Sequence, residues 1–365
     1  MQKSHGWCYL LYSESGNSNI EKIKLILRII GSPYRYPEKV ELNENQIEEL
    51  YEIAVKNKIG LLFLESIEKT NQIANLVDEI EKQRSLYELQ RGTLVRTISS
   101  INRVNCNYAV VKTIFPFPAV PNDIDILILD NDVVYRKVVD ELKKNNFLIL
   151  GQASLEVNLR DMTTAKSADP EAKQWEDIDI YKEVGASHII YMDKTKLRNH
   201  TIKKNVNGQE ITILDEPSEL AISIFHALYP ERIYTLLLHH NILFKLKEMK
   251  RKDMKLFLDI CEEQKIKNAT LVTLRITESI EEICFGEPPN ELMELRDLFG
   301  KKERLEIKKV PYIYPLHVMI SSFWEKKFEK RFIASFVRQA FSFFNPKTAD
   351  FVIKQYKERA ERDTY

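Results

Sequence analysis

The segment from Asn122 to Asp130 has the sequence NDIDILILD, in which Asp123 and Asp125 lie two positions apart beside a run of Ile and Leu. Side chains of a β-strand alternate between its two faces, so the isoleucines share one face while Asp123 and Asp125 share the other. Two neighbouring carboxylates on a half-buried strand repel each other and resist the loss of their water. The pattern therefore predicts a cation, or a shared proton, beside this strand.

A second segment of this kind, WEDIDIYKE, occupies positions 175–183. Within it Asp179 lies between two isoleucines, whereas Asp177 follows another acidic residue and is expected at a solvated strand end. If the two strands pair, Asp179 meets Asp123 and Asp125 across the sheet. Three converging carboxylates favour a divalent cation that prefers oxygen ligands, Mg²⁺ or Mn²⁺, with phosphate oxygens as the remaining ligands.

The spacing of apolar residues divides the chain into three parts. A helical period in the first part gives way to a period of two in the middle, and the helical period then returns. We therefore expect an N-terminal helical region at 1–105, a core of strands and helices at 106–215, and a C-terminal helical domain at 216–365. The expected fold class is α+β, with a mixed β-sheet in the core.

Three local signals define elements of this core. The segment NYAVVKTIF at 107–115 predicts a strand that leads into a proline-rich loop. A helix is expected from Asp130 to Asn145, with Asp130 as its cap. Asn207 and Gly208 separate two alternating runs, which is the strongest short-range signal of a β-hairpin.

The composition excludes several classes of protein. The 365 residues include 54 basic and 54 acidic ones, so no overall charge points to nucleic acid or to a membrane surface. The ten glycines are scattered, which excludes the glycine-rich phosphate loops of Walker and dinucleotide-binding motifs. The four cysteines lack CxxC spacing and are expected to be reduced. Without a signal peptide or a long apolar span, we expect a cytoplasmic protein, and abundant Lys, Glu and Ile suit a thermophile.

The order helix, strand, loop, DxD strand, helix and second DxD strand resembles the nucleotidyltransferase fold of the DNA polymerase β-like superfamily. Within it the chain is most similar to a family of prokaryotic, largely uncharacterised nucleotidyltransferases. The similarity rests on LYEIAVKNKIGLLFLESI, the VVK strand, both DxD strands and ILDEPSELAISIFHALY, and it covers residues 47–229. It implies that Asp123, Asp125 and Asp179 are catalytic and bind Mg²⁺ or Mn²⁺, with a nucleoside triphosphate, preferably ATP, as the substrate.

One position departs from that superfamily, whose first core strand usually ends in Gly-Ser or Gly-Gly. This chain has Lys112 and Thr113 there, and a β-branched threonine does not readily take the positive φ that glycine permits. The Lys112 charge and the Thr113 hydroxyl are then the candidates for holding the triphosphate, unless Lys112 is a solvated surface lysine. Tyr181, at the end of the second DxD strand, is a candidate for stacking on the base, with simple packing as the alternative.

The leading hypothesis is a metal-dependent nucleotidyltransferase that transfers a nucleoside monophosphate to an acceptor hydroxyl on a small molecule, a protein or an RNA. Asp123 and Asp125 would hold the ions, and Asp179 would also help to deprotonate the acceptor. The absence of the usual glycine favours a rival hypothesis. In it the protein has a catalytically degenerate nucleotidyltransferase fold that senses nucleotides or binds a partner. A glycosyltransferase would use the same DxD chemistry, but it needs a longer unit of strands before the motif, where this chain has helices.

Three further features have structural interpretations. His226 lies on the apolar face of a predicted helix and is expected in the core, as are His239 and His240. The basic stretch KLKEMKRKD at 245–253 is expected to be a solvated helix face. The C-terminal aromatic residues follow helical spacing loosely and predict either core packing or a partner surface.

Overall fold

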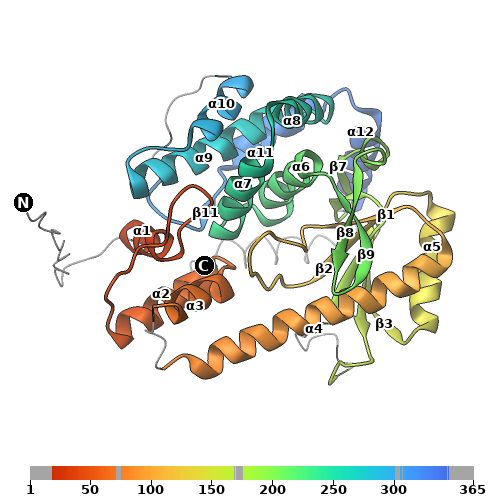
Figure 1. Cartoon of the computed structure of the whole chain (residues 1–365). Coiled ribbons are helices and arrows are strands. Elements are labelled where there is room, and N and C mark those ends of the chain that lie inside the picture. Colours follow the sequence, from red (N-terminus) through yellow and green to blue (C-terminus); the bar gives the residue numbers. More distant parts are fainter. Residues whose placement is uncertain are drawn as a thin grey trace, which may run out of the picture.

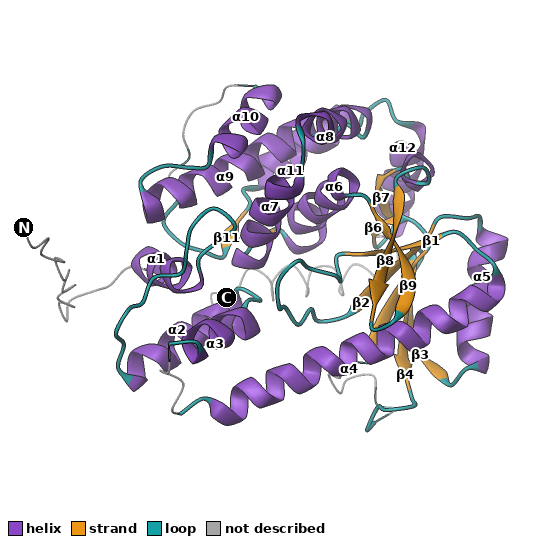
Figure 2. Cartoon of the chain, in the orientation of Figure 1, coloured by secondary structure: helices purple, strands orange, loops and turns teal. Residues whose placement is uncertain are grey.

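The computed structural model of the chain describes residues 19–70, 75–167, 169, 176–300, 305, 307–342 and 344. A mixed seven-stranded sheet lies to the right in Figure 1, with helices packed on both of its faces. Most of the other helices lie beside the sheet, to its left in Figure 2. The predicted α+β fold class is therefore confirmed.

The central sheet contains β1 (Tyr108–Val111), β2 (Ile124–Ile128), β3 (Phe147–Gln152), β4 (Glu156–Asp161), β5 (Asp177–Tyr181), β8 (Thr201–Val206) and β9 (Gln209–Leu214). Its strand order is β3-β4-β5-β2-β1-β9-β8. Pairing is parallel between β2 and β5 and between β1 and β9, and the other pairs are antiparallel. Two short antiparallel pairs also occur, β6 (Val184–Ala186) with β7 (Ile189–Met192), and β10 (Ile233–Tyr234) with β11 (Tyr312–Ile313).

Twelve α-helices occur in the described residues. They are α1 (Asn19–Ile30), α2 (Glu44–Lys56), α3 (Gly60–Glu68), α4 (Val77–Ile101), α5 (Asp132–Lys144), α6 (Glu216–His226), α7 (Leu236–Glu248), α8 (Arg251–Glu263), α9 (Lys267–Phe285), α10 (Asn290–Phe299), α11 (Leu316–Glu325) and α12 (Lys330–Ser342). Three short helical segments are η1 (Asn102–Val104), η2 (Lys194–Leu197) and the π-helical η3 (Ala227–Glu231).

Alternation of side chains gives the central sheet two apolar faces. One face, which includes Val110, is covered by α4 and α5 (Figure 1). The opposite face, which includes Leu127, belongs to a single hydrophobic core shared with α1–α3 and with α6–α11. Asp123 and Asp125 have the same parity as Leu127, so they lie on this second face. The aspartates therefore point toward the side of the sheet where N-terminal and C-terminal helices meet.

The first core strand is shorter than the sequence predicts. Strand β1 ends at Val111 instead of continuing to position 115, because Lys112 takes a left-handed backbone conformation with φ 53°. The Lys112 N–H bonds to the Glu219 carboxylate on α6 at 2.7 Å instead of to a neighbouring strand. The positive φ that glycine would supply at this turn is thus adopted by Lys112 and not by Thr113.

Two expected helix boundaries are wrong. Helix α5 begins at Asp132 and is capped by Asn131, whose side chain accepts from two N–H groups of the first turn. Asp130 does not cap this helix, because its carboxylate accepts instead from the Asn107 N–H at 2.7 Å. The basic stretch 245–253 is not one solvated helix face, because α7 and α8 meet within it and Lys245 is buried.

The predicted hairpin is confirmed. Strands β8 and β9 pair in antiparallel register across Asn207 and Gly208. The φ angles of these two residues are 48° and 82°, and two consecutive positive values are characteristic of the type I′ turn. Asparagine and glycine occupy this turn because they adopt positive φ with little strain.

A buried asparagine joins the N-terminal helices to the C-terminal ones. Asn57, directly after α2, is fully buried, and its side-chain oxygen accepts from the Leu236 N–H at 3.1 Å. Its backbone oxygen accepts from the Leu237 N–H, also at 3.1 Å. These two N–H groups belong to the first turn of α7, so Asn57 caps α7 from a distant part of the chain. We call the contact of Asn57 with Leu236 and Leu237 the leader clasp.

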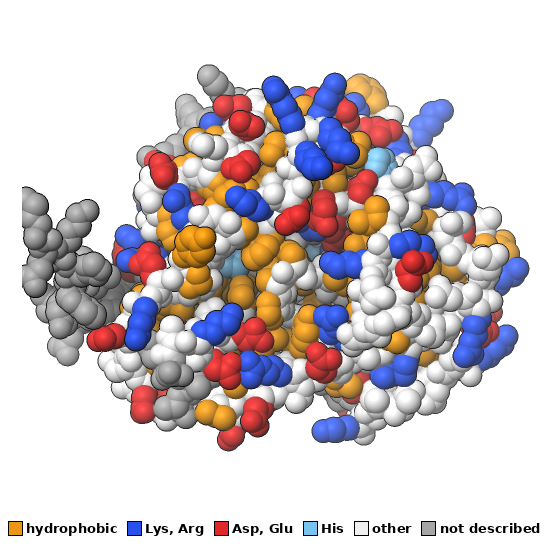
Figure 3. All heavy atoms as spheres, in the orientation of Figure 1, with side chains coloured by type: hydrophobic (Ala, Val, Ile, Leu, Met, Phe, Trp, Pro, Cys, Tyr) orange, Lys and Arg blue, Asp and Glu red, His pale blue; other side chains and the backbone are white. Residues whose placement is uncertain are grey.

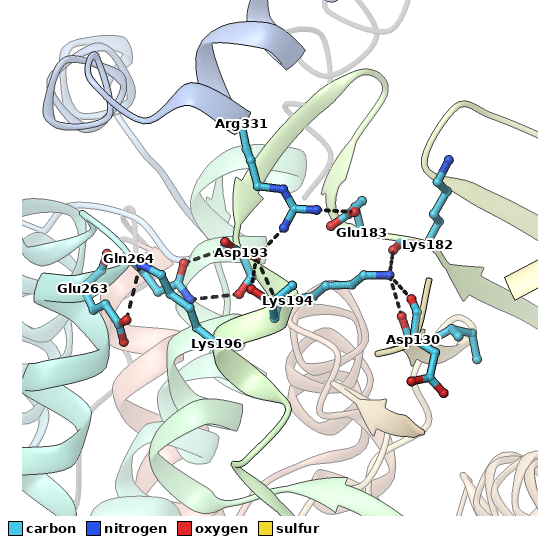
Figure 4. Close-up of polar contacts among 11 residues, drawn as sticks. Asp130, Lys182, Glu183, Asp193, Lys194, Lys196, Glu263, Gln264 and Arg331 are labelled. Atoms are coloured by element: carbon cyan, nitrogen blue, oxygen red, sulfur yellow. Dashed lines mark hydrogen bonds and ion pairs between the residues drawn. The ribbon is translucent and has the colours of Figure 1, made fainter. Parts of the chain in front are cut away.

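Polar contacts around Lys194 and Arg331 connect the sheet with helix α12 (Figure 4). The Lys194 ammonium is buried and donates to three backbone carbonyls at the ends of β2 and β5, at 2.6 to 2.9 Å. All three of its protons are therefore matched by acceptors. Arg331 on α12 bonds to Asp193 and, at 2.9 Å, to Glu183. These contacts fix the end of β5, which carries the second DxD segment.

An exposed apolar surface follows α11 and α12. Ile320 and Trp324 are exposed on α11, and Val337 and Phe341 are exposed on α12, and the two members of each pair are four positions apart. Other aromatic residues of these helices are packed, since the ring centroids of Phe323 and Phe332 lie 5.4 Å apart. The C-terminal aromatic residues are therefore divided between the core and the surface.

Charges of both signs are interspersed on the face of the molecule shown in Figure 3. This distribution agrees with the formal net charge of zero. Among the helices of the described residues, none combines the length and the apolar character needed to cross a membrane.

Candidate metal centre

Three aspartates from two parallel strands converge at one point. Asp125 on β2 lies opposite Asp179 on β5 in the strand register, and Asp123 directly precedes β2. One carboxylate oxygen from each residue lies within 4.8 Å of those of the other two. Asp125 is buried, and the other two are half-buried. The predicted convergence of Asp123, Asp125 and Asp179 is therefore confirmed; we call these three residues the triad.

Strand β4 holds the second DxD segment in place. Asn158 lies opposite Asp179 and donates from Nδ2 to its Oδ1 at 2.8 Å. On the same face of β4, Arg160 is fully buried and binds both carboxylate oxygens of Asp177, at 2.6 and 3.0 Å. Asp177 is thus the partner of a buried guanidinium; it lies at the end of β5 as expected, but its side chain is only 19 % exposed. Both aspartates of β5 are fixed by β4.

The three residues that the sequence suggested for the nucleotide all lie beside the triad. The Lys112 ammonium is 3.1 Å from Asp125 Oδ2 and 5.1 Å from the centroid of the Tyr181 ring. The Tyr181 hydroxyl donates to Asp179 Oδ2 at 3.4 Å. The Thr113 hydroxyl accepts from the Asp125 N–H at 2.9 Å and donates to a carbonyl of β1. Because the Thr113 proton is used within the fold, Lys112 is the stronger candidate donor to a ligand.

Burial and mutual repulsion change the acidity of the triad. Burial, followed by the charges of Asp125 and Asp179, raises the pKa of Asp123 well above its ordinary value. Burial first and Asp125 second also raise the pKa of Asp179, to about 7. Burial acts to lower the pKa of the Lys112 ammonium, but the neighbouring carboxylates of Asp125 and Asp123 outweigh burial and raise it. The triad therefore favours the uptake of a proton or of a further cation.

The metal-free protein is expected to lose stability as the pH rises from about 4 to about 7. Asp179 has a pKa of about 7 when folded and an ordinary value near 4 when unfolded, so the folded state binds the additional proton in this interval. The free energy of unfolding should therefore fall through this window, and Asp179→Asn should flatten the fall. Urea unfolding of both proteins in EDTA, at pH values from about 4 to about 8, measures the difference. Parallel pH profiles would contradict the assignment.

The donor set of the triad fits Mg²⁺ or Mn²⁺. All three donors are carboxylate oxygens, the type of ligand that these ions prefer. Asp125 Oδ1 is buried and has no hydrogen-bond partner among the described residues. A buried carboxylate oxygen without a partner is energetically unfavourable, and a coordinated cation would remove that cost. The triad could therefore hold a divalent ion.

A cavity of about 130 Å³ adjoins the triad. Asp123 and Asp125 line it on the side of the sheet, His226 and Glu231 line it from the C-terminal part of the chain, and Lys58 reaches it from the N-terminal helices. A cavity of roughly 150 Å³ can hold one benzene ring, so this space accommodates a group of similar size. Segments from all three parts of the chain thus meet at the aspartates.

Charged groups of this cavity were missed by the reasoning from sequence. The Lys58 ammonium donates to Glu231 Oε1 at 2.8 Å, and His226 Nδ1 lies 3.7 Å from the same oxygen. Although burial opposes the change, the charge of Lys58 lowers the pKa of Glu231 to about 2. Burial lowers the pKa of His226 to about 4, so its ring is neutral at physiological pH. His226 is half-buried and lines the cavity, so the expected core position was only partly correct.

A buried amide also faces the cavity. Asn241 on α7 is 1 % exposed and donates to the Ser223 hydroxyl at 3.3 Å. Its side-chain oxygen has no partner among the described residues, so it can accept a hydrogen bond from a ligand. The neighbouring His239 and His240 are buried, which confirms the core position expected for them.

Comparison of the chain with protein-family models, with curated proteins and with solved structures finds no match. Likeness in the order of elements does not by itself establish an activity, because one fold hosts many functions. The chemistry of the triad, of Lys112 and of the cavity therefore indicates what the protein can do.

Proposed function

We propose that this protein is a metal-dependent nucleotidyltransferase, which transfers a nucleoside monophosphate from a nucleoside triphosphate to an acceptor hydroxyl. The observation that carries the proposal is the approach of three carboxylates within 4.8 Å beside a cavity that also contains Lys112. A DxD strand at the centre of a mixed sheet is the arrangement expected of a nucleotidyltransferase-like core. The resemblance of residues 47–229 to the prokaryotic nucleotidyltransferase family supports the same activity.

The triad supplies the ion ligands and the base of the proposed reaction. When bound, Mg²⁺ or Mn²⁺ supplies positive charge to phosphate oxygens and lowers the pKa of an acceptor hydroxyl. Asp123 and Asp125 project from one strand and serve as ligands, with Asp179 as the third. Asp179 projects from the neighbouring strand, opposite Asp125, so we assign acceptor deprotonation to it.

Lys112 and Tyr181 complete the site in this proposal. The Lys112 ammonium beside Asp125 can make a charge-assisted hydrogen bond to a phosphate of the substrate, for which ATP is the preferred candidate. Because the Tyr181 ring lies 5.1 Å from this ammonium, its geometry favours a cation–π contact over stacking on the base. Tyr181 then keeps Lys112 in position, while its hydroxyl bonds to Asp179.

A second candidate function is nucleotide sensing by an inactive fold. The observation in its favour is the Lys112 ammonium, which lies 3.1 Å from Asp125 where it competes with a metal ion for the carboxylate. A sensor would bind a triphosphate and release no pyrophosphate with small-molecule, protein or RNA acceptors from a cell extract. The proposed enzyme would release pyrophosphate with at least one of these pools.

A thermal-shift screen of the four common triphosphates, with and without Mg²⁺ or Mn²⁺, tests the proposed function. We expect the ion alone to stabilise the protein and one triphosphate to add to this, by about 2.7 kcal/mol at a ligand concentration near 100 times its Kd. Asp125→Asn should weaken the response to the ion, because it removes a ligand charge. Equal metal-induced shifts in the wild type and in Asp125→Asn would mean that the ion binds elsewhere.

A further inference from the structure

The proposed function leaves one charged pair of the cavity without a role. Lys58 reaches the cavity from the turn between α2 and α3, and its ammonium donates to Glu231 Oε1 at 2.8 Å. We propose that Lys58 is a second cationic ligand for the phosphate groups of the triphosphate, and that Glu231 holds its ammonium until the triphosphate enters. This inference rests on the proposed function, and it adds a binding residue that lies outside the DxD strands and outside the turn at Lys112.

Lys58 can exchange partners more easily than Lys112. The side chains of Lys112 and Asp125 are 12 % and 7 % exposed, so separating them leaves a buried carboxylate without its counter-ion. The side chains of Lys58 and Glu231 are 26 % and 31 % exposed, so water can solvate Glu231 after Lys58 turns away. Lys58 is therefore the cation that this cavity can redirect to a ligand at the lower cost.

The start of helix α7 favours an anion beside Lys58, but its first backbone N–H groups are not free to bind that anion. Thr235, the cap of α7, lines the cavity, and the positive end of the helix dipole lies there. The first three N–H groups of α7 are bonded to Asn57 and to the Thr235 hydroxyl. A phosphate at this end of the cavity therefore needs a side-chain donor, and Lys58 directly follows Asn57 of the leader clasp.

Lys58 ends helix α2 in a left-handed turn, in which its N–H bonds to the Val55 carbonyl at 2.9 Å. Its φ is 61°, a left-handed conformation that glycine adopts with less strain. Lys112 has the same kind of conformation, with φ 53°, and also lines the cavity. Both ammonium charges lower the pKa of Glu231, so the two groups act on the same region. The two lysines thus line one cavity, Lys58 from the N-terminal helices and Lys112 from the end of β1.

Calorimetric titration separates a phosphate ligand from a purely structural lysine. The probes are a non-hydrolysable ATP analogue with Mn²⁺ and inorganic tripolyphosphate. Glu231→Gln removes the charge that holds the Lys58 ammonium. This variant should therefore bind both probes several-fold more tightly than the wild type. Adding Lys58→Met to Glu231→Gln should weaken binding about tenfold or more relative to Glu231→Gln alone, the typical effect of one charge-assisted hydrogen bond. Lys203→Met on β8, where Lys203 is 3.5 Å from Glu210, controls for the loss of one exposed positive charge.

The outcomes distinguish this inference from the proposed function. If the double variant binds both probes as tightly as Glu231→Gln, while all variants keep wild-type melting temperatures, Lys58 contacts no phosphate and the inference is overturned although the function stands. The inference would also be overturned if Lys203→Met weakened probe binding by the same factor as Lys58→Met does in the double variant. The effect would then be one of overall charge. If the wild type binds neither probe, the proposed function fails and the inference fails with it.

Discussion

Asp179→Asn is expected to reduce pyrophosphate release by roughly 10²- to 10⁴-fold, the usual contribution of a positioned general base. Triphosphate affinity should change much less, because asparagine keeps the size of the side chain and the contact with Asn158. The reason for the difference is that Asp179 is assigned to the proton of the acceptor, whereas Asp123 and Asp125 remain as ligands. A coupled pyrophosphate assay and calorimetry with a non-hydrolysable analogue measure the two effects separately.

Asp140→Asn is the matched control for this substitution. Asp140 lies on α5, and its side chain is 65 % exposed. Its replacement removes the same charge from the protein without touching the triad. If Asp179→Asn lowers binding and turnover by the same factor, Asp179 acts only as a ligand; if turnover is unchanged, the assignment of the base is wrong.

Arg160→Met is expected to lower the free energy of unfolding by about 3–5 kcal/mol, the range for breaking a buried ion pair by removing one partner. The guanidinium of Arg160 is fully buried between the Asp177 carboxylate and the backbone oxygens of Ser167 and Asp169. Methionine fills much of the same volume but leaves all of these acceptors without their donor. Urea unfolding monitored by far-UV circular dichroism measures the loss.

Two further variants check the cause of that loss. Arg103→Met removes an arginine that is 61 % exposed and 3.7 Å from Glu141, and it should change stability by less than about 0.5 kcal/mol. Adding Asp177→Leu to Arg160→Met removes the unpaired carboxylate and should recover part of the lost stability. A small loss for Arg160→Met, close to that of Arg103→Met, would show that Arg160 does not anchor β5.

The aspartates could be predicted from the sequence because strand geometry is local. A period of two places Asp123 and Asp125 on one face wherever the strand lies, and the second DxD segment needs only to pair with the first. The hairpin at Asn207 was predictable for the same reason, since its turn type depends on two adjacent residues. Short-range rules thus identify the triad without knowledge of the helices.

The rest of the site could not be predicted because it depends on long-range packing. Lys58 and Glu231 are 173 positions apart in the chain, and no periodicity links a helix end near the N-terminus to a π-helical turn beyond the sheet. The strand predicted at 107–115 ended early because Lys112 adopts φ 53°, a conformation that lysine propensities do not indicate. The ion pair of Asp177 with the buried Arg160 could not be predicted, because it forms only when β4 pairs with β5.

The leader clasp has a consequence for the order of events during biosynthesis. Asn57 and Leu236 are separated by 179 positions, and ribosomes add roughly 5–20 residues per second, so the first partner precedes the second by about 10–35 s. Until then, the apolar faces of α2 and α3 lack the C-terminal helices with which they share a core. A nascent chain of this protein therefore offers a hydrophobic surface to chaperones for that whole interval, and the N-terminal helices reach their final positions among the last events of folding.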